Sequence, residues 1–322
     1  MPEPATRGPW AALELTSDEL AVTLLPEKGC DIVEVVDRRT GIDVMMRTPW
    51  GFGRPPVASS SSFERWLEAY SGGWQVLLPN GGDAVTQHGT EWGFHGEAGI
   101  VPWQVDAHQP AEARLTAWLI TVPLELVREI RLHDRSLVLV ERVRNAGDEP
   151  VEVMWGHHPA FGAPLIEPGA VISMDARTFI ADSREPGAGL EPGARSRWPH
   201  AALARGGTID LSVIPPAAER RAVLGYLGDF ERGTYTIANA RLGLAVTLDW
   251  PADLFPHAWF WQELNATPGY PWFRRLYTTA IEPNTTIPGQ GIVRARADGG
   301  VPLALAAGVT REARIALTLD DA

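Results

Sequence analysis

The sequence predicts an all-β protein of the sandwich class, and three features support this prediction. Hydrophobic residues make up 45% of the 322 residues, which is enough to build a large core. The 32 glycines and 27 prolines recur along the chain and separate short segments of alternating or β-branched character. Regularly spaced short strands bounded by turn residues are typical of β-sandwiches. The clearest such segments are residues 20–25, 124–130, 136–143 and 244–248.

The middle of the chain gives the most definite strand predictions. Residues 124–143 form a hairpin pattern around His133-Asp134-Arg135, and residues 145–150 form the next turn, which leads into a strand from Val151. Residues 183–208 contain so many glycines and prolines that we expect a long surface excursion without regular structure.

One segment departs from the β pattern and predicts a short helix. In residues 61–70, Phe63, Trp66, Leu67 and Tyr70 recur at helical spacing. Ser61 with Glu64 three residues later forms a capping box, and Gly72-Gly73 would end the helix. We expect it to lie over a sheet edge or a loop.

Composition and charge exclude several classes of protein. The net charge is −12 and no basic stripe is present, which argues against a nucleic-acid partner. No apolar run is long enough to span a membrane, and the first ten residues lack a signal segment. Cys30 is the only cysteine, so no disulfide within the chain is possible. We therefore expect a cytoplasmic protein. Without repeats or linkers, residues 1–322 read as one domain, and nothing indicates its oligomeric state.

Lys28 is the only lysine among 28 basic residues. It lies in a turn-like Pro-Glu-Lys-Gly stretch, where we do not expect the buried amine that Schiff-base chemistry requires. No Gly-Lys-Ser/Thr phosphate loop is present either.

Three short segments carry candidate chemistry: residues 92–98, 155–162 and 277–286. His95 precedes Gly96, and His157-His158 follow Gly156. Glycine beside a histidine allows a ligand to approach closely, although such a histidine can equally be structural.

Glu282 is a carboxylate at the predicted end of a strand. A period of two places it on one face with Leu276, Thr278 and Ala280. Both His158 and Glu282 precede proline, which favours extended backbone and a strand end at each residue. Burial would raise the pKa of the Glu282 carboxyl toward that of a general base, whereas a turn cap onto Asn284 or Thr285 is the structural alternative.

The chain has 13 tryptophans against five tyrosines. An indole suits either a core or a sugar surface, since it combines a flat apolar body with one donor. The candidates for a sugar-binding cleft are Trp74, Trp92, Trp155, Trp259 and Trp261.

Together these segments resemble the aldose 1-epimerase, or galactose mutarotase-like, superfamily. The resemblance covers roughly residues 20–300 and rests on four motifs in order. These are Pro-Asn-Gly at residues 79–81, His95-Gly96 ahead of Pro102-Trp103, Gly-His-His-Pro-Ala-Phe at residues 156–161, and Glu282-Pro283.

The resemblance implies a β-supersandwich with minor short helices and a sugar site on its concave sheet. It implies that Glu282 is the general base, His158 the general acid, and His95 the group that assists at the ring oxygen of a hexose. It implies no metal and no organic cofactor. The proposed sugar contacts are Asn80, His157, Trp155, Trp92, Trp259 and Asp249, with Asp229 as a second candidate aspartate. Gly81 stands where the family pattern has arginine, so the sugar is not specified.

Four alternatives stay open. His95, His158 and Glu282 are ligand types that could make a zinc site. A non-catalytic carbohydrate-binding module would keep the tryptophans and not need Glu282. A glycosidase would pair Glu282 with Glu97 or Glu263. A hexose-6-phosphate 1-epimerase would hold the phosphate with arginines, for which the candidates are Arg54, Arg65, Arg274 and Arg275.

Overall fold

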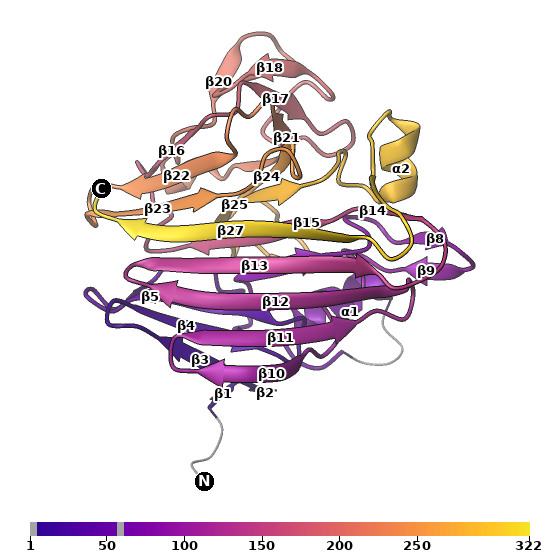
Figure 1. Ribbon diagram of the computed structural model, residues 1–322. Coiled ribbons are helices and arrows are strands. Elements are labelled where there is room, and N and C mark those ends of the chain that lie inside the picture. Colours follow the sequence, from indigo (N-terminus) through magenta and orange to yellow (C-terminus); the bar gives the residue numbers. More distant parts are fainter. Residues whose placement is uncertain (1–4, 57–60) are drawn as a thin grey trace.

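The computed structural model describes residues 5–56 and 61–322, which form two large stacked antiparallel sheets and a few short helices (Figure 1). The fold is all-β, as predicted. In the orientation of Figure 1, an outer sheet lies in front of a larger inner sheet. Among the described residues, no helix is long and apolar enough to cross a membrane.

The outer sheet has eight strands. In spatial order they are β10 (Gln104–Gln109), β11 (Glu112–Trp118), β12 (Leu124–His133), β13 (Ser136–Asn145), β27 (Thr310–Asp320), β23 (Leu244–Asp249), β22 (Thr234–Asn239) and β16 (Val171–Met174). The predicted hairpin is confirmed as β12 and β13.

The inner sheet has eleven strands. In spatial order they are β18 (Arg195–Arg197), β17 (Thr178–Ala181), β21 (Ala222–Gly228), β24 (His257–Leu264), β25 (Tyr277–Asn284), β15 (Gly156–Gly162), β7 (Trp74–Leu77), β5 (Asp31–Asp37), β4 (Leu20–Leu25) and β3 (Leu13–Thr16), with β6 (Ile42–Asp43) paired to β5.

Four two-stranded sheets and three short helices complete the described chain. The strand pairs are β1 (Thr6–Arg7) with β2 (Trp10–Ala11), β8 (Val85–Gln87) with β9 (Thr90–Trp92), β14 (Val151–Val153) with β26 (Leu303–Leu305), and β19 (His200–Ala202) with β20 (Thr208–Asp210). The helices are α1 (Ser62–Ala69), α2 (Ile292–Ala297) and a 3₁₀ turn at Ala217–Glu219. The strand predicted from Val151 is confirmed as β14.

Two sequence-based expectations need correction. Residues 183–208 are not wholly irregular, because β18 and β19 lie within them and β18 extends the inner sheet. His158 and Glu282 do not end their strands either: β15 continues through Pro159 and β25 through Pro283.

The two faces of the inner sheet are buried by different clusters. The larger hydrophobic cluster fills the space between the sheets, and residues such as Phe161, Phe260 and Ile281 belong to it. A second cluster on the opposite face contains Trp66, Ala160, Trp272 and Ala280. Strand alternation separates them, since Ala160 and Ala280 are neighbours in sequence of Phe161 and Ile281. The inner sheet is therefore covered on both faces near its centre.

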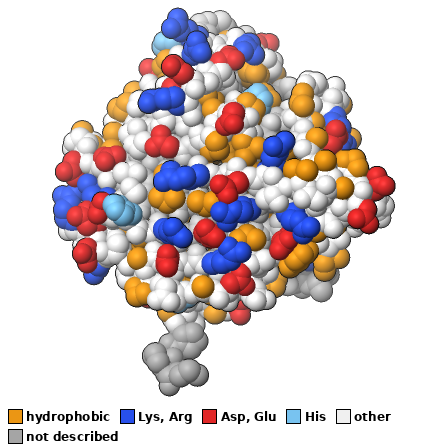
Figure 2. All heavy atoms as spheres, in the orientation of Figure 1, with side chains coloured by type: hydrophobic (Ala, Val, Ile, Leu, Met, Phe, Trp, Pro, Cys, Tyr) orange, Lys and Arg blue, Asp and Glu red, His pale blue; other side chains and the backbone are white. Residues whose placement is uncertain are grey.

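Charged residues cover the outer face of the outer sheet in alternating signs (Figure 2). Arg114 pairs with Glu129, Arg142 with Glu129 and Glu312, and Arg144 with Glu125. These exposed pairs keep a large sheet face polar and add little stability individually.

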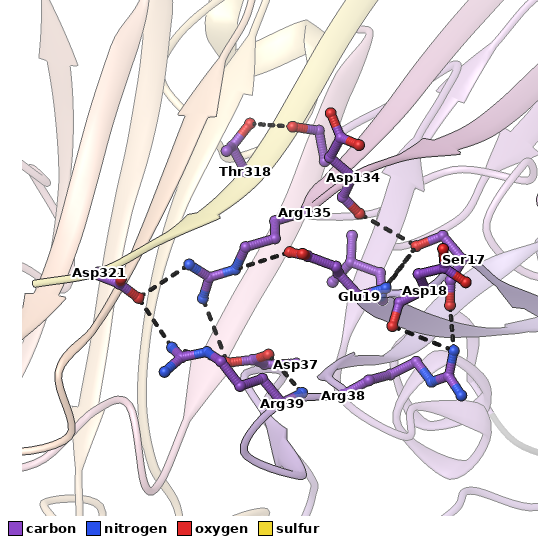
Figure 3. Close-up of polar contacts among 12 residues, drawn as sticks. Ser17, Asp18, Glu19, Asp37, Arg38, Arg39, Asp134, Arg135, Thr318 and Asp321 are labelled. Atoms are coloured by element: carbon purple, nitrogen blue, oxygen red, sulfur yellow. Dashed lines mark hydrogen bonds and ion pairs between the residues drawn. The ribbon is translucent and has the colours of Figure 1, made fainter.

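Ion pairs also join the two sheets at one end of the sandwich (Figure 3). Arg135, in the turn between β12 and β13, reaches Asp37 at the end of β5 at 3.4 Å and Asp321 at 3.1 Å. Arg39 bonds the same Asp321 carboxylate at 2.9 Å. The residues after β27 are thereby tied to the inner sheet.

A buried ion pair connects the outer sheet to the back of the inner sheet. Arg128 on β12 donates to Glu141 on β13 at 2.5 and 2.8 Å, and both side chains are at most 2% exposed. The other Glu141 oxygen accepts the indole N–H of Trp155 at 2.9 Å. Glu141 thus holds the segment that leads into β15.

We expect Arg128→Met to lower the free energy of unfolding by about 3–5 kcal/mol, because it leaves Glu141 buried without its cation. Arg114→Met is the matched control on the same sheet. It breaks an exposed pair and is expected to cost about 0–1 kcal/mol. Urea denaturation at pH 7 measures both variants, and equal losses would contradict this role of Arg128.

Candidate active site

A single row of side chains crosses the inner sheet and reaches the pocket. Tyr226 lies opposite Trp259, and Trp259 lies opposite Glu282. The β15–β25 pairs Gly156↔Asn284 and Ala160↔Ala280 place His158 opposite Glu282. His158 in turn lies opposite Gln75 on β7. Directly opposite residues point to the same sheet face.

The row opens into a cavity of about 530 Å³ on the face away from the outer sheet. This volume is in the range of small-molecule sites. Eight of its lining residues are aromatic, and they are Phe63, Trp66, Tyr70, Phe94, Trp259, Trp261, Tyr270 and Trp272. His95, His158 and Glu282 all line it. The structure thus brings together the three predicted catalytic residues.

Helix α1 builds one wall of this cavity. It starts at the predicted capping box, in which the Ser61 hydroxyl accepts the Glu64 N–H and Glu64 accepts the Ser61 N–H. Trp66 and Leu67 are buried and line the cavity. The helix therefore packs on the site, where Trp66 contacts the loop residues Phe94 and His95, as expected of a helix that lies over a loop.

His95 is aimed into the cavity by unusual backbone. Its φ is 58°, in the left-handed region, and Gly96 follows with φ 80°. A Cβ on Gly96 would lie 2.3 Å from the Leu78 carbonyl oxygen, so this glycine makes room for the chain and not for a ligand. The same holds for Gly156, where a Cβ would lie 2.1 Å from the side-chain amide of Asn284. The ligand-access interpretation of these glycines was wrong.

The backbone also sets the tautomer of His95. Its Nδ1 accepts the Gly82 N–H at 3.1 Å. The ring is therefore neutral with its proton on Nε2. Burial lowers the pKa of His95 well below its ordinary value, and the neighbouring His158 and Lys28 act in the same direction. His95 presents a neutral N–H donor to a ligand.

Glu282 and His158 form a close pair without other strong partners. The distance between Glu282 Oε1 and His158 Nε2 is 3.5 Å. Glu282 Oε2 and His158 Nδ1 are buried and have no hydrogen-bond partner among the described residues. Burial raises the pKa of Glu282 well above its ordinary value. Burial lowers the pKa of His158 to about 4. Burial thus favours the uncharged form of both groups.

Two other acids at the cavity, Glu263 and Asp182, differ from Glu282 because their oxygens are already bonded. Glu263 accepts from the backbone of Ala266 at 2.6 Å, and from the N–H and hydroxyl of Thr267 at 3.0 and 2.5 Å. Asp182 accepts from Tyr226, Gln290 and two backbone N–H groups. These two acids shape loops, whereas Glu282 is free to react.

Most of the predicted sugar contacts do not line the cavity. Trp259 lines the cavity, as does Trp261. Asp249 is exposed on β23 of the outer sheet. Asp229 is 51% exposed and pairs with Arg195. Asp182, which lines the cavity, was not among the candidates, and the sequence holds no distinguishing signal for it.

Three predicted contacts are buried away from the cavity, on the core side of the inner sheet. Trp155 donates to Glu141, Trp92 to the Thr121 carbonyl, and His157 Nδ1 accepts from Trp74. The two indole N–H groups and His157 Nδ1 are thus used within the core, whereas His157 Nε2 has no hydrogen-bond partner among the described residues.

Asn80 also does not line the cavity and instead holds loops together. Its amide donates to the carbonyls of Asp83 and Gly93, and its oxygen accepts the Ile292 N–H. The next residue is glycine for a steric reason: a Cβ on Gly81 would lie 2.5 Å from the Trp259 ring. The Trp259 ring fills the space next to residue 81.

No group of three or more His, Cys, Asp or Glu side chains within residues 5–56 and 61–322 is arranged to hold a metal ion. None of the four candidate phosphate-binding arginines lines the cavity, where Arg184, paired with Asp83 at 2.8 Å, is the arginine present. Glu97 bonds the backbone of Ile120 and Thr121 and does not line the cavity.

Comparison with known proteins agrees with this fold. The structure resembles the Slr1438 protein from Synechocystis sp. PCC 6803 with a TM-score of 0.72 at 16% identity, covering 99% of this chain and 98% of that one. It resembles a galactose mutarotase related enzyme from Lactobacillus acidophilus with a TM-score of 0.68 at 16% identity, covering 96% and 97%. A GalM/aldose epimerase homologue from C. elegans gives 0.63 at 13% identity, covering 97% and 99%.

We expect Glu282→Gln to stabilise the fold, increasingly as pH rises above about 4.5, because the folded wild type must then either keep a proton that the unfolded chain releases or bury an unpaired charge. The folded-state pKa of Glu282 is raised, so wild-type stability is greatest below the unfolded-state pKa and is lost at higher pH. Thermal unfolding between about pH 5 and pH 8 measures the gain. Glu263→Gln is the control, which should show no such gain. A Glu282→Gln protein less stable than wild type at pH 8 would contradict this account.

No curated protein matches the sequence. A family model, described as a domain of unknown function (DUF4432), matches residues 9–319. The chain has a galactose mutarotase-like sandwich fold, and it belongs to the DUF4432 family.

Proposed function

We propose that the protein is an aldose 1-epimerase-type isomerase that interconverts the α and β anomers of an uncharged sugar. The observation that carries the proposal is the close Glu282–His158 pair, which lines the cavity together with aromatic side chains. In this proposal the pair holds one proton in the free protein, on the carboxyl side, because burial disfavours charge on both groups. The fold neighbours named as mutarotase-related support the same reaction class.

Anomer interconversion needs one acid and one base, which a Glu282–His158 pair with one shared proton can supply. The anomeric hydroxyl and the ring oxygen are bonded to the same carbon. The base that serves the hydroxyl and the acid that serves the ring oxygen must therefore lie close together. A separation of 3.5 Å between Glu282 Oε1 and His158 Nε2 meets this need. Glu282 takes the hydroxyl proton, His158 gives a proton to the ring oxygen, and the C–O bond opens to an aldehyde.

The sugar is then closed again after rotation about the C1–C2 bond, with the two proton transfers reversed. When a sugar hydroxyl enters and donates a hydrogen bond to Glu282, the ionised form of Glu282 is stabilised. The shared proton then moves from Glu282 to His158. His95 Nε2–H stabilises the oxygen on which negative charge develops. Trp259 and Trp261 offer apolar ring surface to sugar C–H groups.

The charges at the cavity favour a neutral sugar over a phosphorylated one. The acidic side chains that line it are Asp83, Asp182, Glu185, Glu263 and Glu282. Arg184 is 53% exposed and already paired with Asp83. A phosphate dianion would thus face more acids than bases.

Glu282 and Glu263 are too far apart to serve as the two carboxylates of a glycosidase. Glu263 lies opposite Thr278, four residues along the ladder from Glu282. Four strand residues span about 13 Å, whereas the two carboxylates of glycosidases lie roughly 5–10 Å apart. Glu263 also uses both oxygens in hydrogen bonds.

Glu282→Gln should reduce mutarotation by about 10²–10⁴-fold, because the base is lost, and leave sugar binding intact. Polarimetry of glucose, galactose and glucose 6-phosphate measures the rate and the substrate class together. Glu97→Gln is the matched control and should keep the wild-type rate. If the wild type binds a sugar but does not change its mutarotation rate, the protein is a carbohydrate-binding module.

The rate should depend on pH as a bell, because the pair works with one proton and fails with two or none. The acid limb falls as His158 gains a proton near its lowered pKa of about 4. The alkaline limb falls where Glu282 ionises, above its ordinary pKa. Mutarotation rates between about pH 3 and pH 10 test this. A flat profile over that range would rule out the pair as acid and base.

A further inference from the structure

Three further polar side chains, Gln75, Asp31 and Lys28, continue the row behind His158, and the proposed reaction does not use them. Gln75 lies opposite His158 on β7. The pair Ile32↔Trp74 places Asp31, the first residue of β5, opposite Gln75. Lys28 bonds Asp31 from the turn before β5 at 2.6 Å. All three are at most 1% exposed.

The burial of Lys28 corrects the sequence-based expectation. The residue does lie in the turn that the sequence indicated, but its side chain points inward and is 1% exposed. Its ammonium lies 5.7 Å from the centre of the Trp66 ring, and Trp66 is a wall of the cavity. The chain's one lysine is therefore beside the site.

The orientation of the Gln75 amide is determined by its two acceptors. Its Nε2 donates to Asp31 Oδ2 at 3.0 Å and to the Gly72 carbonyl at 2.7 Å. Lys28 bonds the same Asp31 oxygen and neutralises its charge. The amide cannot flip without facing two acceptors with its oxygen. Gln75 Oε1 is consequently an acceptor.

Two unpartnered atoms lie on neighbouring residues of this row. Gln75 Oε1 and His158 Nδ1 are both buried and have no hydrogen-bond partner among the described residues. Directly opposite residues have Cβ atoms about 5 Å apart, so these atoms are on adjacent side chains of one sheet face. Buried polar atoms without partners are costly, and an N–H···O bond between these two atoms, which the structure does not itself contain, would satisfy both.

We propose that Lys28, Asp31 and Gln75 are positioning residues that fix the tautomer of His158, with its proton on Nδ1 directed at Gln75 Oε1. His158 Nε2 is then the atom that exchanges a proton with Glu282 and the sugar. The ring keeps its Nδ1 proton throughout, since the imidazolium also donates from Nδ1. The catalytic consequence rests on the proposed function, whereas the tautomer does not.

The arrangement separates the roles of the two site histidines. His95 has its Nδ1 occupied by the Gly82 N–H, so its proton is on Nε2. In the proposed arrangement His158 donates from Nδ1 to Gln75 Oε1, so its proton is on the other nitrogen. His95 can only donate to the sugar, and His158 can accept.

The test is the side-chain ¹⁵N NMR spectrum of His158, assigned with a His158→Asn protein. At pH 7 the wild type should show a protonated Nδ1 and a bare Nε2. Gln75→Leu should shift His158 toward the Nε2–H tautomer and lower kcat by about tenfold or more, with a smaller change in KM. A wild-type His158 with its proton on Nε2 would overturn the proposal.

Two further variants keep the result interpretable. Lys28→Met combined with Asp31→Asn removes both charges without leaving either one unpaired, and should loosen Gln75 and give mixed His158 tautomers. Asn239→Leu is the matched control: this buried amide on β22 also donates to two carbonyls, at 3.1 Å each. It should lose stability and leave the His158 signals unchanged.

The NMR measurement and the activity measurement can refute the positioning role and the proposed function independently. If the wild type shows the Nδ1–H tautomer and no mutarotation, the positioning holds and the proposed function fails. If it mutarotates and Gln75→Leu changes neither the tautomer nor kcat, the positioning role is refuted and the proposed function stands.

Discussion

The site depends on the register of the strands at the centre of the inner sheet. Because β24, β25, β15 and β7 pair without a shift here, Trp259, Glu282, His158 and Gln75 lie side by side on one face. A slip of one residue on any strand would turn its side chain into the core between the sheets. The reacting pair is thus a property of the sheet, and loops contribute only His95 and the cavity rim. Elements built on strands hold a site more rigidly than loops do.

Burial is what makes this pair chemically unusual. The core behind it is occupied by Trp155, His157 and the Arg128–Glu141 pair, and the cavity in front is walled by aromatic rings. Glu282 therefore has little access to water and no cation to pair with, which raises its pKa. Glu282 keeps an oxygen without a partner, whereas the oxygens of Glu263 and Asp182, which line the same cavity, are all bonded. Such selective lack of partners is typical of a functional residue.

Much of the fold and part of the site could be predicted from the sequence. Alternation and turn residues predicted the hairpin 124–143, and the capping box predicted α1, because both signals are local. Glu282, His158 and His95 were identified through motif order. The tryptophan and aspartate contacts failed for a different reason. Nothing local tells whether an indole on a strand faces the core or the cavity, and Trp92 and Trp155 face the core. Lys28 and Gln75 were missed because their burial follows from strand order, which brings residues 28, 75 and 158 together across three strands.

The protonation state of Glu282 tests the central claim most directly. The account requires a carboxyl that stays protonated at pH 7 in the free protein, beside a neutral His158. Infrared difference spectra of wild type minus Glu282→Gln should show the C=O stretch of a buried carboxylic acid at pH 7, and a carboxylate band should replace it only at alkaline pH. Carboxylate bands alone at pH 7 would contradict the shared-proton pair.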